Sequence, residues 1–322
     1  MWIVLQHRDG QFHRGSWEAI AAGQKLAREL GSAAEAILLG ENLGALVSEA
    51  AGSALAALRV AESHALAVYT PGAYVSALAS AIASAAPRVV LFPHTYQSTE
   101  YVPRLAQATG AALVTEAIAF SVEGPEIEWR RPVLGGKLHA RVRARGQAPV
   151  LATLQSGAFS AEEREAGRAP VESFAVPGST APDREILGTE QAGGEMVDLS
   201  QAEVVVAVGR GVGGSDKFGP IEELARLLHA EIGASRPVID SGWLPRDRQI
   251  GSSGQTVAPR LYLALGISGA IQHLVGMKGS SCVVAVNKDP SAPIFKIAHY
   301  GIVGDLHEVV PALVQALRGE AS

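Results

Sequence analysis

The sequence predicts an α/β protein of two domains, each with a mostly parallel sheet that carries helices on both faces. Short β-branched runs alternate with Ala-rich segments of helical spacing in the first half, and the alternation restarts after a break at residues 160–200. Alternating strands and helices are typical of parallel sheets, because the crossover helices cover the sheet faces. A length of 322 residues also favours two domains.

The first half begins with strands that we expect to be buried on both faces, namely Trp2–Gln6, Ala36–Leu39 and Val89–Phe92. Two segments between them have helical spacing, Ser16–Leu30 and Pro71–Ala86, and Ser16 is a candidate N-cap. Farther along, residues 126–131 and 137–145 predict two antiparallel strands around a turn at Gly135-Gly136. Arginines alternate with apolar residues in the second of these strands, which predicts a basic outer face. We interpret that face as a solvated surface, with a docking surface as the alternative.

Residues 160–200 lose periodicity and gather Pro, Gly and Ser, for example at Pro177-Gly178-Ser179 and Gly193-Gly194. We therefore expect domains at residues 1–190 and 191–322. In the second domain we expect the strands Glu203–Val208, Pro237–Asp240, Leu261–Leu265 and Ser281–Val286. Two helices are predicted there, Pro220–Glu231 and Asp305–Leu317. Asp305 and Glu308 have the spacing of a capping box at the start of the second helix.

Composition excludes several classes of function. A net charge of −5 argues against nucleic acid or an anionic membrane as the main partner. A single cysteine, Cys282, excludes a disulfide framework and a cysteine-based metal site, and we expect no metal. The N-terminus lacks the cationic lead of a signal peptide, and no apolar stretch reaches membrane-spanning length, so we expect a cytoplasmic protein.

Residues 209–214 match the G-x-G-x-x-G pattern of dinucleotide-binding loops. With Asp240 expected at the end of the next strand, this pattern predicts an NAD-dependent dehydrogenase. However, the following helix is predicted to begin only near Gly219-Pro220, whereas the pattern requires its third glycine in the first helical turn. A nucleotide-binding module without redox chemistry is a further alternative.

Several polar, glycine-rich turns follow predicted strands or precede helices in the second domain. Because the carboxyl ends of parallel strands share one edge, these turns should converge on a crevice there. Backbone N–H groups and two arginines would then suit the phosphates of a dinucleotide. The turns are residues 209–211, 233–237, 250–254, 266–273 and 287–290.

These turns also carry a resemblance to a known family. From Val204 to Val310 the chain resembles the FAD-binding domain of electron-transfer flavoprotein alpha subunits, through the segments GASR, GISGAIQH and NKDP-x-APIF. The first half is similar to the other domain of that subunit, more loosely, through VVLFPHT, RRPVLGGK and LATLQSGAF.

The resemblance implies an FAD site in this chain. Arg210, Ser235 and Arg236 would contact the flavin. Ile250, Gly251, Ser252 and Ser253 would wrap the ring edge, and Ser253 would bond flavin N5 where threonine is typical of the family. Ser268, Gly269, Ala270, Ile271 and Gln272 would hold the pyrophosphate, and His273 would lie near flavin O2. Asn287, Asp305 and Leu306 would line the pyrophosphate and adenosine end.

Positive charge near the ring favours reduction, because the reduced flavin carries negative charge. We expect Arg236, Ser253 and His273 to tune the flavin. The sources of the positive charge would be Arg236, His273 and the positive end of a helix that begins near Gly269.

The family also implies partners. A beta subunit would contact the N-terminal domain, complete the flavin site and hold AMP, which gives a heterodimer with one FAD. Flavin dehydrogenases, such as acyl-CoA dehydrogenases of fatty acid β-oxidation, would deliver electrons. An electron-transfer flavoprotein-quinone oxidoreductase of the respiratory chain would receive them, in a bacterium.

Overall fold

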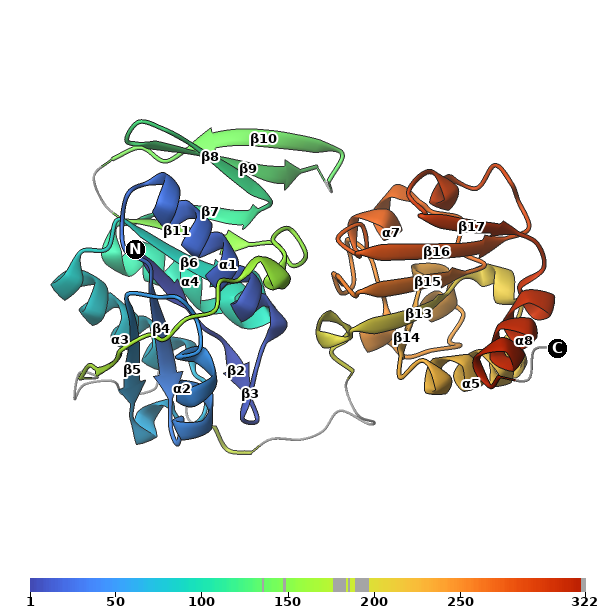
Figure 1. Cartoon of the computed structure of the whole chain (residues 1–322), viewed down its shortest axis with the longest axis horizontal. Coiled ribbons are helices and arrows are strands. Elements are labelled where there is room, and N and C mark those ends of the chain that lie inside the picture. Colours follow the sequence, from blue (N-terminus) through green and yellow to red (C-terminus); the bar gives the residue numbers. More distant parts are fainter. Residues whose placement is uncertain (135, 147–148, 176–183, 185, 189–196, 320–322) are drawn as a thin grey trace. The chain divides into compact units, whose positions relative to one another are not determined.

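A computed structural model describes residues 1–134, 136–146, 149–175, 184, 186–188 and 197–319. The chain forms two compact units (Figure 1). The first contains Met1–Val133 and Leu138–Thr189, and the second contains Leu134–Lys137 and Glu190–Ser322. The predicted boundary at residues 190–191 lies outside the described residues, as do Pro177-Gly178-Ser179 and Gly193-Gly194. Within the described ranges, no helix combines the length and the apolar character needed to cross a membrane.

The first unit is built on a parallel sheet, to which the described residues contribute seven strands. β1 lies in its middle, where Ile3 pairs with Ala36 on one side and Leu91 on the other. The parallel architecture predicted for this half is confirmed. In spatial order the strands are β12 (Val171–Ser173), β5 (Ala57–Glu62), β4 (Glu35–Gly40), β1 (Trp2–Val4), β6 (Val89–Pro93), β11 (Val150–Leu154) and β7 (Ala112–Ala117).

Helices cover both faces of this sheet, because successive side chains of a strand point to opposite faces. Ile3 and Leu5 pack in one core with residues of α1 and α2, whereas Trp2 and Val4 pack in the other with residues of α3 and α4. The helices are α1 (Arg14–Glu29), α2 (Gly44–Ala50), α3 (Pro71–Ala85) and α4 (Tyr96–Thr109). A short hairpin of β2 (His7–Arg8) and β3 (Gln11–Phe12) follows β1.

A separate antiparallel sheet contains β8 (Ala119–Glu123), β9 (Glu126–Val133) and β10 (Leu138–Arg143). The predicted pairing of the last two strands is confirmed, although Gly135 of their turn lies outside the described residues. The arginines of β10 face solvent next to acidic neighbours. Arg143 pairs with Glu123 and Glu126, each at 2.7 Å, and Arg141 pairs with Glu128. These glutamates neutralise the basic face, which favours the solvated interpretation over a docking surface for an acidic partner.

The second unit contains a parallel sheet of five strands within the described residues. After β13 the chain adds β14 on one side and then crosses to the other side to form β15. The strands in spatial order are β14 (Glu231–Ala234), β13 (Val204–Val208), β15 (Leu261–Leu265), β16 (Cys282–Asn287) and β17 (Tyr300–Val303).

The two faces of this second sheet are covered differently. On one face lie α5 (Gly219–Leu227), α6 (Arg236–Asp240) and α8 (Leu306–Leu317), whose apolar side chains join Val206 and Val208 in a single core. On the other face, the short helix α7 (Ile271–Val275) and irregular segments cover Tyr262 and its neighbours. The predicted α/β architecture is confirmed for this unit as well.

The prediction of a strand at Pro237–Asp240 was wrong. The strand is β14, whose first residue, Glu231, was predicted to end the preceding helix. Pro237 lies in the first turn of α6. Proline is favoured in a first helical turn, because its missing N–H has no partner there in any case. The helix predicted at Pro220–Glu231 consequently ends earlier, at Leu227.

Two predicted helix caps also differ in detail. His13 caps α1, with its Nδ1 accepting from the Gly15 N–H at 3.0 Å, whereas Ser16 lies inside the helix and its hydroxyl bonds the backbone of Gln6. Asp305 caps α8 as predicted, but it accepts from the N–H of His307 at 2.9 Å, and no capping box with Glu308 is formed.

A carboxyl group is buried inside the first unit. Glu18 of α1 is 3% exposed; its carboxylate accepts from the Gly157 N–H at 2.8 Å and lies 3.6 Å from Arg14 Nε. Burial raises the pKa of Glu18 to about 7, although the Gly157 hydrogen bond and the Arg14 charge both oppose the rise. The folded state therefore holds this proton more tightly than the unfolded state does.

This raised pKa predicts a loss of stability with rising pH. Protonation of Glu18 stabilises the fold fully below about pH 4.5, and this contribution is lost as the pH rises through about 7. Glu18→Gln should remove the dependence between pH 5.5 and 8, which amounts to about 2 kcal/mol. Urea unfolding, followed by tryptophan fluorescence at several pH values, measures the free energy of unfolding of each variant. The exposed Glu49→Gln is the control, and an equal slope in both variants would contradict the prediction.

Candidate functional site

The predicted site residues lie at the carboxyl ends of parallel strands in the second unit. Arg210 follows β13, Ser235 and Arg236 follow β14, and Asn287 ends β16. The segment 268–273 follows β15 and enters α7, and Asp305 and Leu306 follow β17. Residues 250–253 belong to a long segment between α6 and β15. In open parallel sheets, ligands bind at this edge, where the strand order reverses. Here the reversal lies between β13 and β15.

The base of the site is a close contact between the turns after β13 and β15. The Gly209 N–H donates to the Leu265 carbonyl at 2.8 Å, and the Gly211 N–H to that of Gly266 at 3.2 Å. A Cβ at Gly209 would lie 2.2 Å from the Gly266 carbonyl oxygen, and a Cβ at Gly211 would lie 2.8 Å from its Cα. These glycines are therefore required for backbone packing.

The two glycine-rich turns differ in the N–H groups that they leave for a ligand. Within residues 209–214, the N–H groups of Gly209, Gly211, Val212 and Gly213 all donate to backbone carbonyls. By contrast, the N–H groups of Ser268, Gly269 and Ala270 meet no acceptor in the described part of the chain. The turn at 266–270 thus presents consecutive unpaired donors, which are suited to a phosphate group.

The turn at 266–270 is held in place from below. Gly269 has φ +88, and a Cβ there would lie 2.3 Å from the Ile294 nitrogen. The Ile294 N–H donates to the Ser268 carbonyl at 3.1 Å, and the Asn287 amide donates to the Ile267 carbonyl at 2.9 Å. The Asn287 side chain thus orients the turn through its backbone.

The segment from Gln249 to Gln255 folds into a tight loop beside this turn. The Ile250 N–H donates to the Ala234 carbonyl at 2.9 Å, and the Ser252 N–H donates to the Gln272 carbonyl at 2.8 Å. These bonds tie the loop to the end of β14 and to the first turn of α7. The hydroxyl-bearing side chains of Ser252 and Ser253 remain exposed.

His273 points into the protein, where both of its ring nitrogens have partners. Nδ1 lies 3.1 Å from the Ile250 carbonyl oxygen and Nε2 lies 2.8 Å from the Tyr262 hydroxyl. Since a carbonyl only accepts, Nδ1 carries the proton and Nε2 accepts from Tyr262. Burial lowers the pKa of His273 to about 4, against the opposing effect of the Ile250 bond. The ring is therefore neutral at pH 7 and lacks the positive charge that we expected from the sequence.

Two arginines stand at the outer part of the site. Arg210 is exposed and has no ion-pair partner among the described residues. Arg236 is also exposed, and its Nε lies 3.3 Å from the Asp240 carboxylate on the same helix. A solvent-exposed pair of this kind is worth little, so Arg236 can exchange Asp240 for another partner. Asp240 ends a helix, away from the strand end where a ribose-binding acid would stand.

The first turn of α8 closes the site on a further side. Leu306 is buried, and its Cδ2 lies 2.9 Å from where a Cβ of Gly266 would be. Asp305 pairs with Lys288 Nζ at 2.9 Å, and this hydrogen bond is the main reason why the pKa of Asp305 is lowered. The Asp305 carboxylate therefore already has hydrogen-bond partners within the protein, Lys288 and the His307 N–H.

At the ends of β1 and β6, the corresponding edge of the first unit is occupied by its own side chains. Thr95, after β6, donates through its hydroxyl to the Gln6 side chain at 2.6 Å, and the Gln6 backbone bonds the Ser16 hydroxyl. A Cβ at Gly15 would lie 2.9 Å from the Pro93 Cβ. Both helix starts are therefore capped and packed against strand ends, unlike the turn at 266–270.

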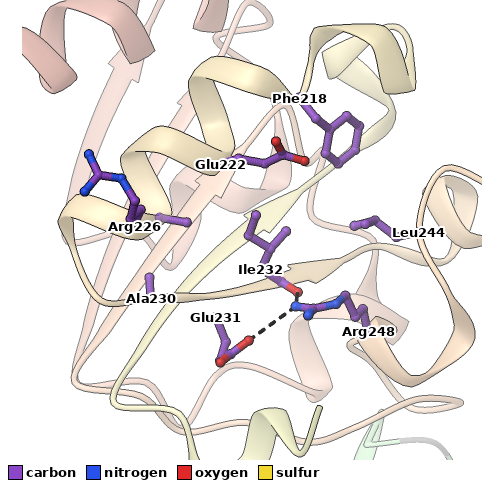
Figure 2. Close-up of a pocket in the computed structure, with 9 residues that line it drawn as sticks. Phe218, Glu222, Arg226, Ala230, Glu231, Ile232, Leu244 and Arg248 are labelled. Atoms are coloured by element: carbon purple, nitrogen blue, oxygen red, sulfur yellow. Dashed lines mark hydrogen bonds and ion pairs between the residues drawn. The ribbon is translucent and has the colours of Figure 1, made fainter. Parts of the chain in front are cut away.

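A pocket of about 320 Å³ lies elsewhere in the second unit, between α5, β14 and the segment 244–248 (Figure 2). Apolar residues such as Phe218 and Ile232 line it together with charged ones, namely Glu222, Arg226, Glu231 and Arg248. Arg248 crosses one side of it, where it donates to the Ile232 carbonyl at 2.8 Å and pairs with Glu231 at 3.3 Å. None of the predicted site residues lines this pocket.

Comparison with known families agrees with this geometry. The profile of the electron transfer flavoprotein domain matches residues 1–179, and that of the electron transfer flavoprotein FAD-binding domain matches residues 198–278. The chain belongs to the electron-transfer flavoprotein alpha-subunit family. The FAD-binding match covers β13 to α7. It includes the turn at 266–270, which we call the donor-bearing turn, and the loop with Ser253. Membership implies a role in electron transfer by a flavoprotein.

Individual members of the family align along their whole length. The chain is 38% identical to the electron transfer flavoprotein subunit alpha of Bacillus subtilis (strain 168), over 98% of this chain and 97% of the relative. It is 35% identical to the electron transfer flavoprotein subunit alpha of Thermoanaerobacterium thermosaccharolyticum, over 99% of this chain and 97% of the relative. It is also 33% identical to the acryloyl-CoA reductase electron transfer subunit beta of Anaerotignum propionicum, over 99% of this chain and 95% of the relative.

Two polar residues of the site were not singled out from the sequence. Lys288 pairs with Asp305, and Gln249 donates to the Ser253 hydroxyl oxygen at 2.9 Å. Lys288 belongs to the quoted family segment NKDP, so the resemblance could have identified it. Gln249 stands four residues before Ser253, but this spacing indicates a contact only once the chain is known to fold as a tight loop.

The hydrogen bond between Tyr262 and His273 should be measurable as stability. Tyr262→Phe leaves the Nε2 of His273 buried without a donor, which costs about 1–3 kcal/mol. Urea unfolding of the purified protein measures the loss. Tyr300→Phe removes the same hydroxyl from a side chain that is 67% exposed and should change stability little. Equal effects in the two variants would mean that the buried hydroxyl contributes nothing.

Proposed function

We propose that this chain binds one FAD at the carboxyl edge of its second sheet and acts as the alpha subunit of a heterodimeric electron carrier. The observation that carries the proposal is the run of unpaired N–H groups at Ser268, Gly269 and Ala270, inside the segment that matches the FAD-binding domain. Consecutive donors of this kind fit a pyrophosphate, which the two halves of FAD share.

The other predicted residues have proposed roles in binding FAD. Ile271 and Gln272 extend the donor-bearing turn, because the first N–H groups of a helix lack internal acceptors. Ile250, Gly251, Ser252 and Ser253 border the flavin ring, and Ser253 offers its hydroxyl to N5. Ser235 and Leu306 line the site, and Asn287 holds the turn from below. The bound flavin supplies the chemistry, since it accepts and releases electrons.

The protein's contribution is electrostatic. Arg210 and Arg236 are exposed cations at the edge of the site, and positive charge there favours the reduced flavin, which carries negative charge. His273 is neutral, whereas the sequence led us to expect a positive charge. It positions residues 250–253, the ring-edge loop, through its hydrogen bond to the Ile250 carbonyl. We assign tuning by charge to Arg236 and tuning by hydrogen bonding to Ser253.

The partners proposed are those of the family. A beta subunit binds the first unit, completes the flavin site and holds AMP. Flavin dehydrogenases, such as acyl-CoA dehydrogenases, deliver electrons, and an electron-transfer flavoprotein-quinone oxidoreductase receives them. A relative that is named as an electron transfer subunit of acryloyl-CoA reductase supports a CoA-ester enzyme as one partner. The cytoplasmic location expected from the sequence stays a prediction.

The geometry disfavours an NAD-dependent dehydrogenase that uses residues 209–214. Four N–H groups of that loop are consumed by backbone carbonyls, and α5 begins only at Gly219. The third glycine of the pattern therefore lies outside the helix that would receive a pyrophosphate.

The visible spectrum of the purified complex tests the proposed function. The chain is co-expressed with its cognate beta subunit, and we expect one flavin per heterodimer on size exclusion. Reduced acyl-CoA dehydrogenase should then bleach the flavin absorbance. A stable complex that binds NAD in place of flavin, or an alpha chain that is fully flavinated without a partner, would contradict the proposal.

The donor-bearing turn can be tested at a single atom. Ala270→Pro removes one unpaired N–H, and the Ala270 φ of −58 already suits proline. A hydrogen bond to a charged group contributes about 1.5–3 kcal/mol, so FAD should dissociate roughly 10- to 100-fold more readily. Fluorescence titration of the apoprotein with FAD measures this constant. Ala270→Gly keeps the N–H, adds no side chain that could cap α7, and should bind FAD nearly as the parent does. A similar loss in both variants would argue against this contact.

A further inference from the structure

Gln249 is a buried glutamine beside the candidate flavin-binding loop. It is 6% exposed, and its Nε2 donates to the Ser253 hydroxyl oxygen at 2.9 Å. Its backbone is fixed at both ends, because its N–H donates to the Arg246 carbonyl at 3.1 Å and its carbonyl accepts from the Gln255 N–H at 2.7 Å. A Cβ at Gly254 would lie 2.3 Å from the same carbonyl, so the chain packs closely around it.

This hydrogen bond determines what the Ser253 hydroxyl can offer. A hydroxyl has one proton and two lone pairs, and an amide N–H that points at the oxygen occupies a lone pair. The proton is then left to another partner, and no acceptor for it occurs in the part of the chain that the structure describes. A hydroxyl that accepts a hydrogen bond is also a better donor, because the two bonds polarise each other.

We infer that Gln249 is a positioning residue for the flavin: its amide N–H occupies one lone pair of the Ser253 hydroxyl oxygen and so directs the hydroxyl proton toward the ligand. This inference rests on the proposed function. Gln249 acts through Ser253, so its effect on the flavin should vanish when the Ser253 hydroxyl is absent.

The test compares four forms of the flavin-loaded heterodimer: the parent, Gln249→Met, Ser253→Ala and the double variant. Methionine approximates the length of glutamine but lacks the N–H group. The flavin midpoint potential is measured by spectroelectrochemistry, and FAD affinity is measured separately by titration. We expect Gln249→Met to shift the potential in the same direction as Ser253→Ala, and the double variant to shift it no further than Ser253→Ala alone.

A second variant reverses the direction of the bond. An ionised carboxylate in Gln249→Glu accepts the Ser253 proton, whereas a protonated one can donate as the amide does. Relative to the parent at each pH, its potential should approach that of Ser253→Ala at high pH and return toward the parent at low pH. A residue that only supports the loop would show no such dependence.

Gln255→Met provides the matched control within the loop. The Gln255 amide donates to the carbonyls of Val197 and Asp247 and makes no hydrogen bond to the Ser253 hydroxyl within the described residues. Its effect should therefore add to that of Ser253→Ala. The inference is overturned if Gln249→Met leaves the potential unchanged, if its shift adds to that of Ser253→Ala, or if Ser253→Ala has no effect. In those cases flavin is still bound and the proposed function stands, whereas a parent complex without flavin would refute both.

Discussion

The candidate site depends on the close approach of two backbone turns at the edge of the second sheet. Gly209 and Gly211 lie against Gly266 so closely that a Cβ on either of the first two would overlap the partner backbone. Two backbone hydrogen bonds join the same turns. Because the turn after β15 is anchored in this way, the donors that follow it stand in fixed positions. The glycines of the G-x-G pattern thus serve the ligand indirectly, by supporting another loop.

The two units show how one architecture is used differently. Both place the starts of helices near the carboxyl ends of parallel strands. In the first unit, His13 caps α1, and Thr95 caps α4 and also donates to the Gln6 side chain. In the second, the N–H groups of Ser268, Gly269 and Ala270 at the corresponding edge have no acceptor within the described residues. Side chains that cap their own helix remove a binding site, and glycine or alanine at the same places leaves one.

Much of the fold could be predicted from the sequence, because long apolar runs such as Val204–Val208 have few alternatives to a buried strand. The failures came where local signals compete. Pro237 interrupts a short apolar segment, and only the tertiary structure shows that it starts a helix instead of lying in a strand. Ser16 looks like a cap because hydroxyls favour that position, but its partner Gln6 lies ten residues away.

The site was predictable in its location and less so in its interactions. The resemblance placed His273 near the flavin, yet its charge state depends on Tyr262, which lies on a different element, and on burial. Neither can be inferred from a spacing of eleven residues. Likewise, residues 209–214 and 266–270 look equally suited to a phosphate in sequence. Only the hydrogen bonds of their backbones distinguish them.

The position of Arg248 has a consequence for how this sheet meets other molecules. β14 is an edge strand, and an open edge invites a foreign strand to pair with its free backbone groups. Arg248 occupies the Ile232 carbonyl, and the chain itself continues along the edge by pairing Ile250 with Ala234. An approaching strand would have to displace a charged side chain and part of the ring-edge loop. This edge is thereby protected against strand addition and the aggregation that can follow from it.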